Sequence, residues 1–485
     1  MPPMALLLRC LALAAAIAVA PALHAAPPAQ QWFTVLLDGR KIGSFEATRE
    51  ERAGTVTTTQ SLELVLDRAG TRIALGSSET SVETPTGEPI SFRNATRLSD
   101  QETVTEGRVE GDHAEVTIRG AGGSQPRRID WPRGALLAEG QRLATARAGL
   151  APGSRHSLLT FQPSTLTSVR IDGSVGAAER VDLPGGARTL VPIQQVIAFP
   201  GASMTSRVWI DAEQAVHKMT MPLMGVDLVL LACDRACATA PNQGTDVFER
   251  TLARAPRALS TQELSGTMRH TLVARDGGAL ALPTTDEQQV RREGDRWIVT
   301  IRDEAEAGHQ APPVADDRAP NDWLQSTEPE VVALAARATE GAATAGERMQ
   351  RLEAFVRDYI RTKSLDVGYA SALEVVRAPE GDCTEHAVLL AALARASGIP
   401  TRVVDGLAYA PGFGGRDQVF VPHAWVQAWT DGRWRGYDAA LDGFDAAHIA
   451  LATGDGDPWH FYAGLDMLGR ISVERSDSVP VDTTR

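Results

Sequence analysis

This chain has fewer positively charged residues than negatively charged ones. Its 485 residues carry 48 Lys and Arg against 61 Asp and Glu, which gives a formal net charge of -13 at pH 7. Nucleic acids and anionic membrane surfaces bind proteins through clustered Lys and Arg, so this charge balance argues against broad affinity for either. A neutral or basic peptide is an electrostatically easier partner. We expect a protein or peptide substrate, with cell-envelope components among the options, and the sequence indicates no oligomeric state.

Long apolar runs are equally scarce. The run over residues 11–23 follows a cation at Arg9 and leads to small residues at Ala25-Ala26. A charged start, a short apolar run and a small exit are typical of a secretory signal peptide, so we interpret residues 1–25 as one, with an uncleaved anchor as the alternative. No later stretch of the sequence is long and apolar enough to span a membrane. These features predict a periplasmic or secreted protein without stable membrane insertion.

The chain also has few cysteines, 4 in all. Removal of the expected signal peptide would leave three of them: Cys233, Cys237 and Cys383. An odd set in an oxidising compartment suggests one pair and one working thiol. In an extended strand Cys233 and Cys237 would lie about 13 Å apart, so a disulfide between them needs a tight turn, and two buried thiols remain the alternative. No His or further Cys stands near the pair at metal-ligand spacing, and the pair lacks the two-residue spacing of thioredoxin-like sites. We therefore expect no metal and no cofactor.

A chain of this length predicts several domains, here in an α+β multidomain fold. Residues 27–240 are dense in Val, Thr, Ile and turn residues without helical periodicity, which predicts an antiparallel β-rich domain. We expect its first hairpin from Gln31–Leu37 and Lys41–Ala47, because Asp38-Gly39 readily adopts the positive φ of a tight turn. Further strands are expected around Val116, at Val169–Ile171 before Asp172-Gly173, and at Val208–Ile210 before Asp211.

Two segments precede the last domain. Residues 250–310 contain the strand-like segments Thr267–Arg275 and Arg296–Arg302, which predict a small β region of its own or an extension of the first domain. Residues 311–320 are rich in proline, which disfavours both helix and sheet pairing, so we interpret them as a stiff linker and place the main boundary there. Residues 321–485 then form the last domain.

Helical periodicity begins in this last domain. Thr327 with Glu330 fits a capping box, and Thr344 with Glu347 fits another. The second helix carries an apolar stripe that we expect in the core: Met349, Leu352, Val356 and Tyr359.

A lone cysteine stands at the start of the next helix. Asp382 can cap this helix, and Gly398 with Pro400 can end it. Cys383 then lies in the first turn, where the helix dipole favours a thiolate and backbone N–H groups can hold an oxyanion. A buried structural cysteine is the alternative that this helix alone leaves open.

A strand and its hairpin supply a base and an acid. Residues 422–430 alternate so that His423 and Trp425 share one face, and Asp431-Gly432 predicts a two-residue turn. Thr430 then pairs with Arg433, which makes His423 and Asp438 diagonal neighbours about 7 to 8 Å apart at the backbone. An imidazole and a carboxylate at that spacing can share a hydrogen bond, and a shift of one residue would turn the two side chains to opposite faces. This register favours a catalytic His423 over a packed core histidine.

These segments together resemble the core of the transglutaminase-like superfamily. The residues that carry the resemblance are Gly381-Asp-Cys-x-Glu-x-Ala-x-Leu-Leu-x-Ala-Leu-x-Arg-Ala-x-Gly-Ile-Pro-x-Arg-Val-Val, then His423-Ala-Trp-Val, Gly432-x-Trp434 and Tyr437-Asp438. The resemblance covers roughly Asp322 to Leu468, a third of the chain. Ala439 stands where the family often has proline, and no family is recognised across the N-terminal half.

The resemblance implies a papain-like fold and a thiol mechanism. By position, Cys383 corresponds to the nucleophile, His423 to the general base and Asp438 to the carboxylate that orients the imidazole. Such an enzyme forms a thioester from a peptide or glutamine amide and passes the acyl group to water or to another amine. The oxyanion would accept hydrogen bonds from the Cys383 N–H and from one further donor, for which Tyr369 is the candidate. Animal members of the family use calcium, but nothing in this sequence demands it.

Two functions from different classes follow. The first is an exported cysteine enzyme of amide hydrolysis or acyl transfer, with hydrolysis favoured slightly because it needs no second substrate site. The second is a non-catalytic binding or assembly module that retains the fold. We expect structural roles for other residues of this domain: an outward Glu385, a packed His386, a mobile rim at Gly412–Gly415 and a core or cleft wall of Trp429, Trp434 and Trp459.

Overall fold

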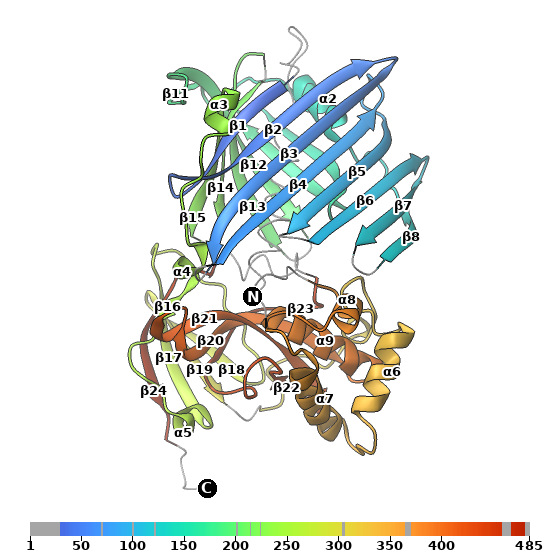
Figure 1. Ribbon diagram of the computed structural model, residues 1–485. Coiled ribbons are helices and arrows are strands. Elements are labelled where there is room, and N and C mark those ends of the chain that lie inside the picture. Colours follow the sequence, from blue (N-terminus) through green and yellow to red (C-terminus); the bar gives the residue numbers. More distant parts are fainter. Residues whose placement is uncertain are drawn as a thin grey trace. The chain divides into compact units, whose positions relative to one another are not determined.

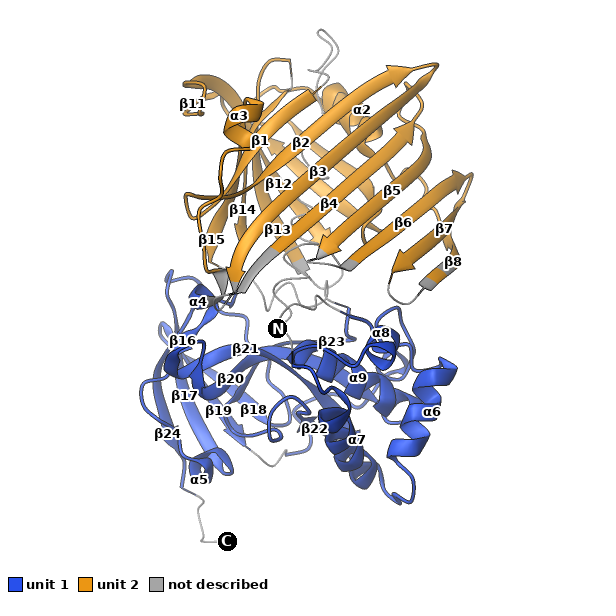
Figure 2. Ribbon diagram, in the orientation of Figure 1, with its two compact units in different colours: residues 1–6, 248–485 blue, residues 7–247 orange. Residues whose placement is uncertain are grey.

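The structure is a computed structural model that describes residues 30–68, 71–98, 101–120, 123–199, 202–213, 215–223, 225–302, 306–363, 370–457 and 467–480. The chain divides into two compact units between Val247 and Phe248. Figure 2 colours the two units separately. The expected signal peptide, Tyr369 and Trp459 lie outside the described residues.

Unit 2, which ends at Val247, is built on one sheet of 15 strands (Figure 1). The strand order is β8-β7-β6-β5-β4-β3-β2-β1-β15-β14-β13-β12-β10-β9, with β11 paired to β12. The paired strands are antiparallel, as the sequence predicts. The strands are β1 (Gln30–Leu37), β2 (Arg40–Arg52), β3 (Thr55–Arg68), β4 (Thr71–Glu83), β5 (Pro89–Leu98), β6 (Gln101–Glu110), β7 (His113–Gly120), β8 (Gly123–Asp130), β9 (Arg155–Gln162), β10 (Thr167–Val175), β11 (Glu179–Val181), β12 (Arg188–Phe199), β13 (Ala202–Ile210), β14 (Val216–Leu223) and β15 (Val226–Cys233).

The first hairpin has its predicted position. Leu37 pairs with Arg40, and the two residues between them, Asp38 and Gly39, have φ angles of 50° and 74°. Positive φ at both positions is what this tight turn requires. The turn residues Asp172-Gly173, in contrast, lie inside β10. Pairing with β9 on one side and β12 on the other holds these residues extended, so cross-strand hydrogen bonding overrides their local preference for a turn.

The cysteines of unit 2 form a disulfide between Cys233 and Cys237. The short helix α3 (Arg235–Ala238), capped by the side chain of Asp234, supplies the tight turn and brings the two Cα atoms to 6.0 Å. Unit 2 also contains α2 (Ala138–Ala148), and α4 (Val247–Thr251) spans its end.

Unit 1 contains two antiparallel sheets (Figure 1), and of the three predicted site residues only His423 lies on a strand of one of them. One has 5 strands in the order β16-β21-β20-β23, with β22 paired to β21, and the other has 4 strands in the order β18-β19-β17-β24. The strands are β16 (Ala253–Arg254), β17 (Thr267–Ala274), β18 (Gln288–Glu293), β19 (Arg296–Arg302), β20 (Thr401–Phe413), β21 (Arg416–Thr430), β22 (Arg433–Tyr437), β23 (His448–Gly454) and β24 (Ile471–Ser478). The helices are α5 (Thr261–Leu264), the 3₁₀ helix η1 (Ala315–Asp317), α6 (Pro329–Ala338), α7 (Ala345–Tyr359), α8 (Ala372–Arg377) and α9 (Cys383–Ala396).

The domain boundary lies near residue 247, and the expected boundary at 311–320 falls inside unit 1. The segment 250–310 is not a separate region, because β16 pairs with β21 and β17 pairs with β24. The proline-rich segment is itself packed: Asp317 is 6% exposed and forms an ion pair with Arg402. Hydrogen bonds over long sequence separations therefore tie both segments to the C-terminal fold.

The helix caps follow the sequence in part. The capping box of Thr344 and Glu347 is present at the start of α7, and Met349, Leu352 and Val356 are buried on that helix. The box predicted for Thr327 and Glu330 is wrong. Proline at the first position of α6 sets the start of the helix one residue later, with Glu328 as a cap that makes no side-chain hydrogen bond. Among the residues described here, we find no helix both long and apolar enough to cross a membrane.

Candidate active site

The N-terminus of α9 fixes the position of Cys383. The Asp382 side chain accepts the N–H of Thr384 at 2.9 Å, and the Glu385 side chain accepts the N–H of Asp382 at 2.9 Å, which completes a capping box. Gly381 has a φ of 149°, and a Cβ there would lie 2.4 Å from the Glu385 side chain, so glycine is required for this cap. Cys383 is 8% exposed and remains a thiol.

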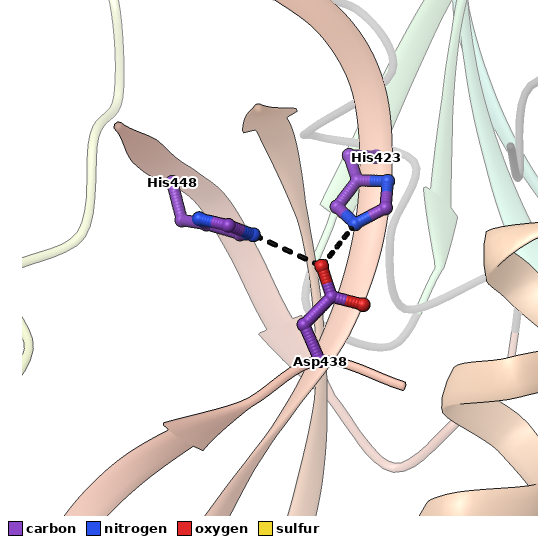
Figure 3. Close-up of side chains that lie close together, drawn as sticks. All are labelled: His423, Asp438 and His448. Carbon is purple, nitrogen blue, oxygen red and sulfur yellow. Dashed lines mark hydrogen bonds and ion pairs between the residues drawn. The ribbon is translucent and has the colours of Figure 1, made fainter. Parts of the chain in front are cut away.

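The register predicted for the β21–β22 hairpin is confirmed. Thr430 pairs with Arg433 and Val426 with Tyr437, so Asp438 follows directly after β22. The His423 Nε2 atom lies 2.7 Å from Oδ2 of Asp438 (Figure 3). His423 is 4% exposed and Asp438 1%, so this contact is shielded from water.

His423 also forms a side-chain hydrogen bond with Cys383. Because Nε2 faces Asp438, the ring nitrogen left for the sulfur is Nδ1. The three residues predicted from the sequence are therefore brought together, with the imidazole between the sulfur and the carboxylate. This is the arrangement that nucleophile, base and orienting acid require.

The charges of Cys383, His423 and Asp438 affect one another's pKa values. Burial lowers the pKa of His423, but the charges of Asp438 and Cys383 and the hydrogen bonds to both raise it to about 10. Burial and the charge of Asp382 raise the pKa of the Cys383 thiol, whereas the charge of His423 and its hydrogen bond to the sulfur lower it. The attraction between Cys383 and His423 thus favours a thiolate beside an imidazolium.

Asp438 is held on several sides. Its Oδ1 accepts the N–H groups of Ala440 at 2.8 Å and Leu441 at 3.2 Å, and its own N–H donates to Glu353 of α7 at 2.6 Å. Burial raises the pKa of the Asp438 carboxyl, but His423 lowers it more through charge and hydrogen bonding, so the pKa lies below its usual range. The carboxylate thus stays ionised opposite the imidazole.

A second imidazole was missed by the sequence analysis. His448, the first residue of β23, places Nε2 3.0 Å from Oδ2 of Asp438, the same oxygen that His423 contacts (Figure 3). Its Nδ1 lies 2.9 Å from Oδ1 of Asp445. No spacing rule marks His448 in the sequence, because the loop from 438 to 448 returns it to the site.

His423, Asp438 and His448 are also residue types that bind metal ions, and their ligand atoms lie within 4.8 Å of one another. Ligands around tetrahedral zinc at about 2.0 to 2.1 Å would stand about 3.3 Å apart. The two nitrogen-to-oxygen distances here are 2.7 and 3.0 Å, which are those of hydrogen bonds. The geometry fits a proton-sharing network better than a metal centre.

Two further carboxyl groups, those of Glu385 and Asp405, are buried in this part of unit 1. Glu385, expected to point outward, is fully buried and accepts the N–H of Ala370 at 3.0 Å besides that of Asp382. All residues of α9 from Cys383 to Arg395 are buried, so the helix has no exposed face on which Glu385 of the first turn could point outward. Asp405 of β20 is 6% exposed, and burial together with the nearby Cys383 raises its pKa well above the usual range.

The remaining predicted positions have structural roles. His386 is packed as expected at 1% exposure, with Nδ1 2.6 Å from the Asp382 carbonyl oxygen. Gly412–Gly415 belongs to the hairpin between β20 and β21, in which Phe413 pairs with Arg416. Trp434 is fully buried and packs edge-to-face on Trp429.

Comparison with known proteins adds family evidence for this region. Residues 332–439 match the family model described as "Transglutaminase-like superfamily", so the C-terminal part of the chain carries a transglutaminase-like core. A search of curated protein sequences finds no match.

Three solved structures are similar to parts of the chain. The first, named "Putative Cysteine Protease from Cytophaga hutchinsonii", is 15% identical over 45% of this chain and 84% of that chain, with a TM-score of 0.28. A beta-barrel-like protein of a domain of unknown function from Brucella abortus is 12% identical over 43% of this chain and 96% of that chain, with a TM-score of 0.34. A structure named "Putative Protease from Parabacteroides distasonis" is 10% identical over 72% and 68%, with a TM-score of 0.20.

Proposed function

We propose that this protein is an exported cysteine enzyme that hydrolyses or transfers the acyl groups of peptide or glutamine side-chain amides. The observation that carries the proposal is the position of His423, which contacts the thiol of Cys383 and the carboxylate of Asp438 at once. Family membership of the C-terminal part supports the same chemistry. Export rests on the N-terminal sequence alone.

In the first half of the reaction the Cys383 thiolate attacks the amide carbonyl carbon, and a carbon–sulfur bond forms. The negative charge that develops on the carbonyl oxygen faces the N-terminus of α9, whose dipole favours it. The carbon–nitrogen bond then breaks, and the imidazolium of His423 gives its proton to the departing amine. A thioester and a neutral imidazole remain.

In the second half water or an amine attacks the thioester carbonyl. The imidazole of His423 takes the proton of the attacking group, the carbon–sulfur bond breaks, and the thiolate–imidazolium pair is restored. Water yields a carboxylic acid and an amine yields a new amide. The pKa of the Asp438 carboxyl is low, so Asp438 stays ionised, orients the His423 ring and does not take the proton from it.

Alkylation of the thiol tests this function. With iodoacetamide at pH 6, the Cys383 thiol should react about 10 to 100 times faster than an ordinary thiol, since an ordinary thiol is almost entirely protonated there. His423→Ala should slow the reaction at least about tenfold, and Cys383→Ala should abolish the label. Equal and slow labelling in the wild type and His423→Ala would favour a non-catalytic binding module.

Substrates can be trapped with the Cys383→Ala variant and identified by mass spectrometry. Wild-type protein incubated with the same material, with and without an added amine, separates hydrolysis from transfer: a carboxylic acid product in both reactions indicates hydrolysis, and an amine adduct indicates transfer. The net charge of -13 leads us to expect neutral or basic peptides among the trapped partners. A captured set enriched in acidic peptides would contradict that expectation.

A further inference from the structure

We propose that His448 is a positioning residue of this site: it shares the carboxylate of Asp438 with His423 and thereby sets the pH range over which the thiol reacts. The inference rests on the proposed thiol chemistry. His448 is not one of the three residues assigned as nucleophile, base and orienting acid, which are Cys383, His423 and Asp438.

The hydrogen-bond geometry carries the first step. Both Nε2 atoms point at Oδ2 of Asp438, from 2.7 Å for His423 and 3.0 Å for His448 (Figure 3). The two rings meet edge to face with centroids 5.6 Å apart. One carboxylate oxygen therefore serves two imidazoles, and the attraction that it offers His423 is divided.

The surroundings of His448 carry the second step. The ring is 2% exposed and is enclosed by the aromatic side chains of Trp425 and Phe444, with centroid distances of 5.2 and 4.9 Å. A buried ring at this distance from Asp438 is fixed in place, so its interaction with the carboxylate is not averaged by motion or screened by water.

A second carboxylate carries the third step. Asp445 lies 2.9 Å from Nδ1 of His448, so the ring bridges two acids, and a ring that donates to both is an imidazolium. Burial lowers the pKa of His448, but hydrogen bonds to Asp438 and Asp445 and their charges raise it to about 9. A neutral ring would instead accept the N–H of Asp445, 3.1 Å from Nδ1.

Other titratable groups act on His448 as well. Glu287, which precedes β18, and Glu353 of α7 interact with its charge, and His423 of β21 faces it across the ring contact. Asp438 and Asp445 make its direct contacts from the loops before β23. These acids favour the charged ring, whereas the imidazolium of His423 opposes it.

The consequence is a charge effect with a definite sign. A positive His448 lowers the proton affinity of every neighbouring group, so it favours the Cys383 thiolate at lower pH and lets His423 release its proton at lower pH. Removal of this charge should therefore shift both limbs of the pH–rate profile upward.

The experiment measures alkylation of Cys383 by iodoacetamide from pH 4 to pH 11 in the wild type and in His448→Gln, whose amide still donates a hydrogen bond to Asp438 but carries no charge. The limb of the pH–rate profile that deprotonation of His423 controls should move upward by about 2 pH units, as expected for a unit charge about 5.6 Å away at an effective dielectric constant near 20. The limb of the profile that deprotonation of the Cys383 thiol controls should move in the same direction.

A compensating variant separates this role from a merely structural one. Asp445→Asn added to His448→Gln removes the negative charge that is left behind, so both limbs should return toward the wild-type positions. A lost packing contact would not be restored by a second loss. The control is His217→Gln in unit 2, where a similar pair has Nε2 and Oδ2 of Asp211 2.7 Å apart, and it should leave the profile unchanged.

A second measurement follows the histidine rings by NMR titration in the same proteins. His423 should titrate at higher pH in His448→Gln and return in the double variant, whether or not the thiol turns out to be reactive. Slow labelling of wild-type Cys383 at every acidic pH would contradict the proposed function. The titration of the histidine rings would still test whether His423 and His448 share Asp438. An unchanged His423 titration in folded His448→Gln, or a shift that the double variant fails to reverse, would overturn the proposal.

Discussion

Gly406 of β20 lies directly opposite His423 of β21. A Cβ on Gly406 would lie 2.1 Å from the carbonyl oxygen of Ile449 in β23 and 2.7 Å from the ring of Trp425. The absence of a side chain at Gly406 thus lets β23 approach β20 and brings His448, one residue before Ile449, toward the site. Close backbone approach, rather than turn geometry, requires glycine here.

Gly406→Ala should therefore damage both stability and reactivity. The added methyl group must displace β23 or the ring of Trp425, and overpacking of this kind costs about 1 to 3 kcal/mol. Urea unfolding followed by circular dichroism measures the loss, and Cys383 labelling at pH 6 should slow in parallel. Gly412→Ala is the control in the same strand, because its Cβ would meet no atom closer than 3.7 Å. Equal stability of the two variants would contradict this account of Gly406.

Asp438→Asn should weaken the thiolate–imidazolium pair while it preserves the size of the side chain. The charge of Asp438 raises the pKa of His423, so its removal should bring that pKa down and shift thiolate formation to higher pH. We expect alkylation of Cys383 at pH 6 to slow by at least about tenfold. Asp211→Asn, which alters the similar pair in unit 2, should have no effect on labelling. A rate within twofold of the wild type would show that the carboxylate charge is dispensable.

Asp382→Ser separates the cap of α9 from its charge. Serine can keep the hydrogen bond to the N–H of Thr384, so stability should change little, whereas Asp382→Ala should lose about 1 kcal/mol in urea unfolding. The negative charge of Asp382 raises the pKa of the Cys383 thiol. The serine variant should therefore reach half of its maximal labelling rate at lower pH than the wild type. A shift to higher pH would mean that the cap, and not the charge, governs the thiol.

Glu353→Gln should stabilise the protein at alkaline pH. Burial raises the pKa of Glu353 from 4.5 to about 7, although the hydrogen bond from Asp438 and nearby cations oppose this. An acid with a raised folded-state pKa favours folding below its unfolded pKa, and this advantage is lost as the pH rises from about 4.5 to about 7.

The glutamine variant should therefore match the wild type at pH 4 and exceed it at pH 8 by up to about 3 kcal/mol in urea unfolding, since glutamine retains the acceptor for the Asp438 N–H. Glu340→Gln, in the exposed turn after α6, serves as the control at both pH values. A glutamine variant less stable than the wild type at pH 8 would contradict the raised pKa.

Local chemistry explains the parts of the site that the sequence predicted. The cap at Asp382, the turn at Asp431-Gly432 and the pairing of Thr430 with Arg433 involve residues within a few positions of one another. A two-residue turn sets the register of the whole hairpin, so the approach of Asp438 to His423 follows from the alternation of side chains along two short strands. The nature and position of these residues were open to prediction for that reason.

Tertiary packing decided what the sequence alone could not. His448 reaches Asp438 because β23 pairs with β20, and Glu385 turns inward because the helix is covered on both faces. The domain boundary moved because β17 pairs with β24, about 200 residues later in the chain. Periodicity and turn chemistry report only on near neighbours along the chain, whereas these contacts depend on which surfaces meet after the elements have formed. The sequence by itself therefore determined the thiol, the base and the acid, and only the folded structure decided which second imidazole shares that acid.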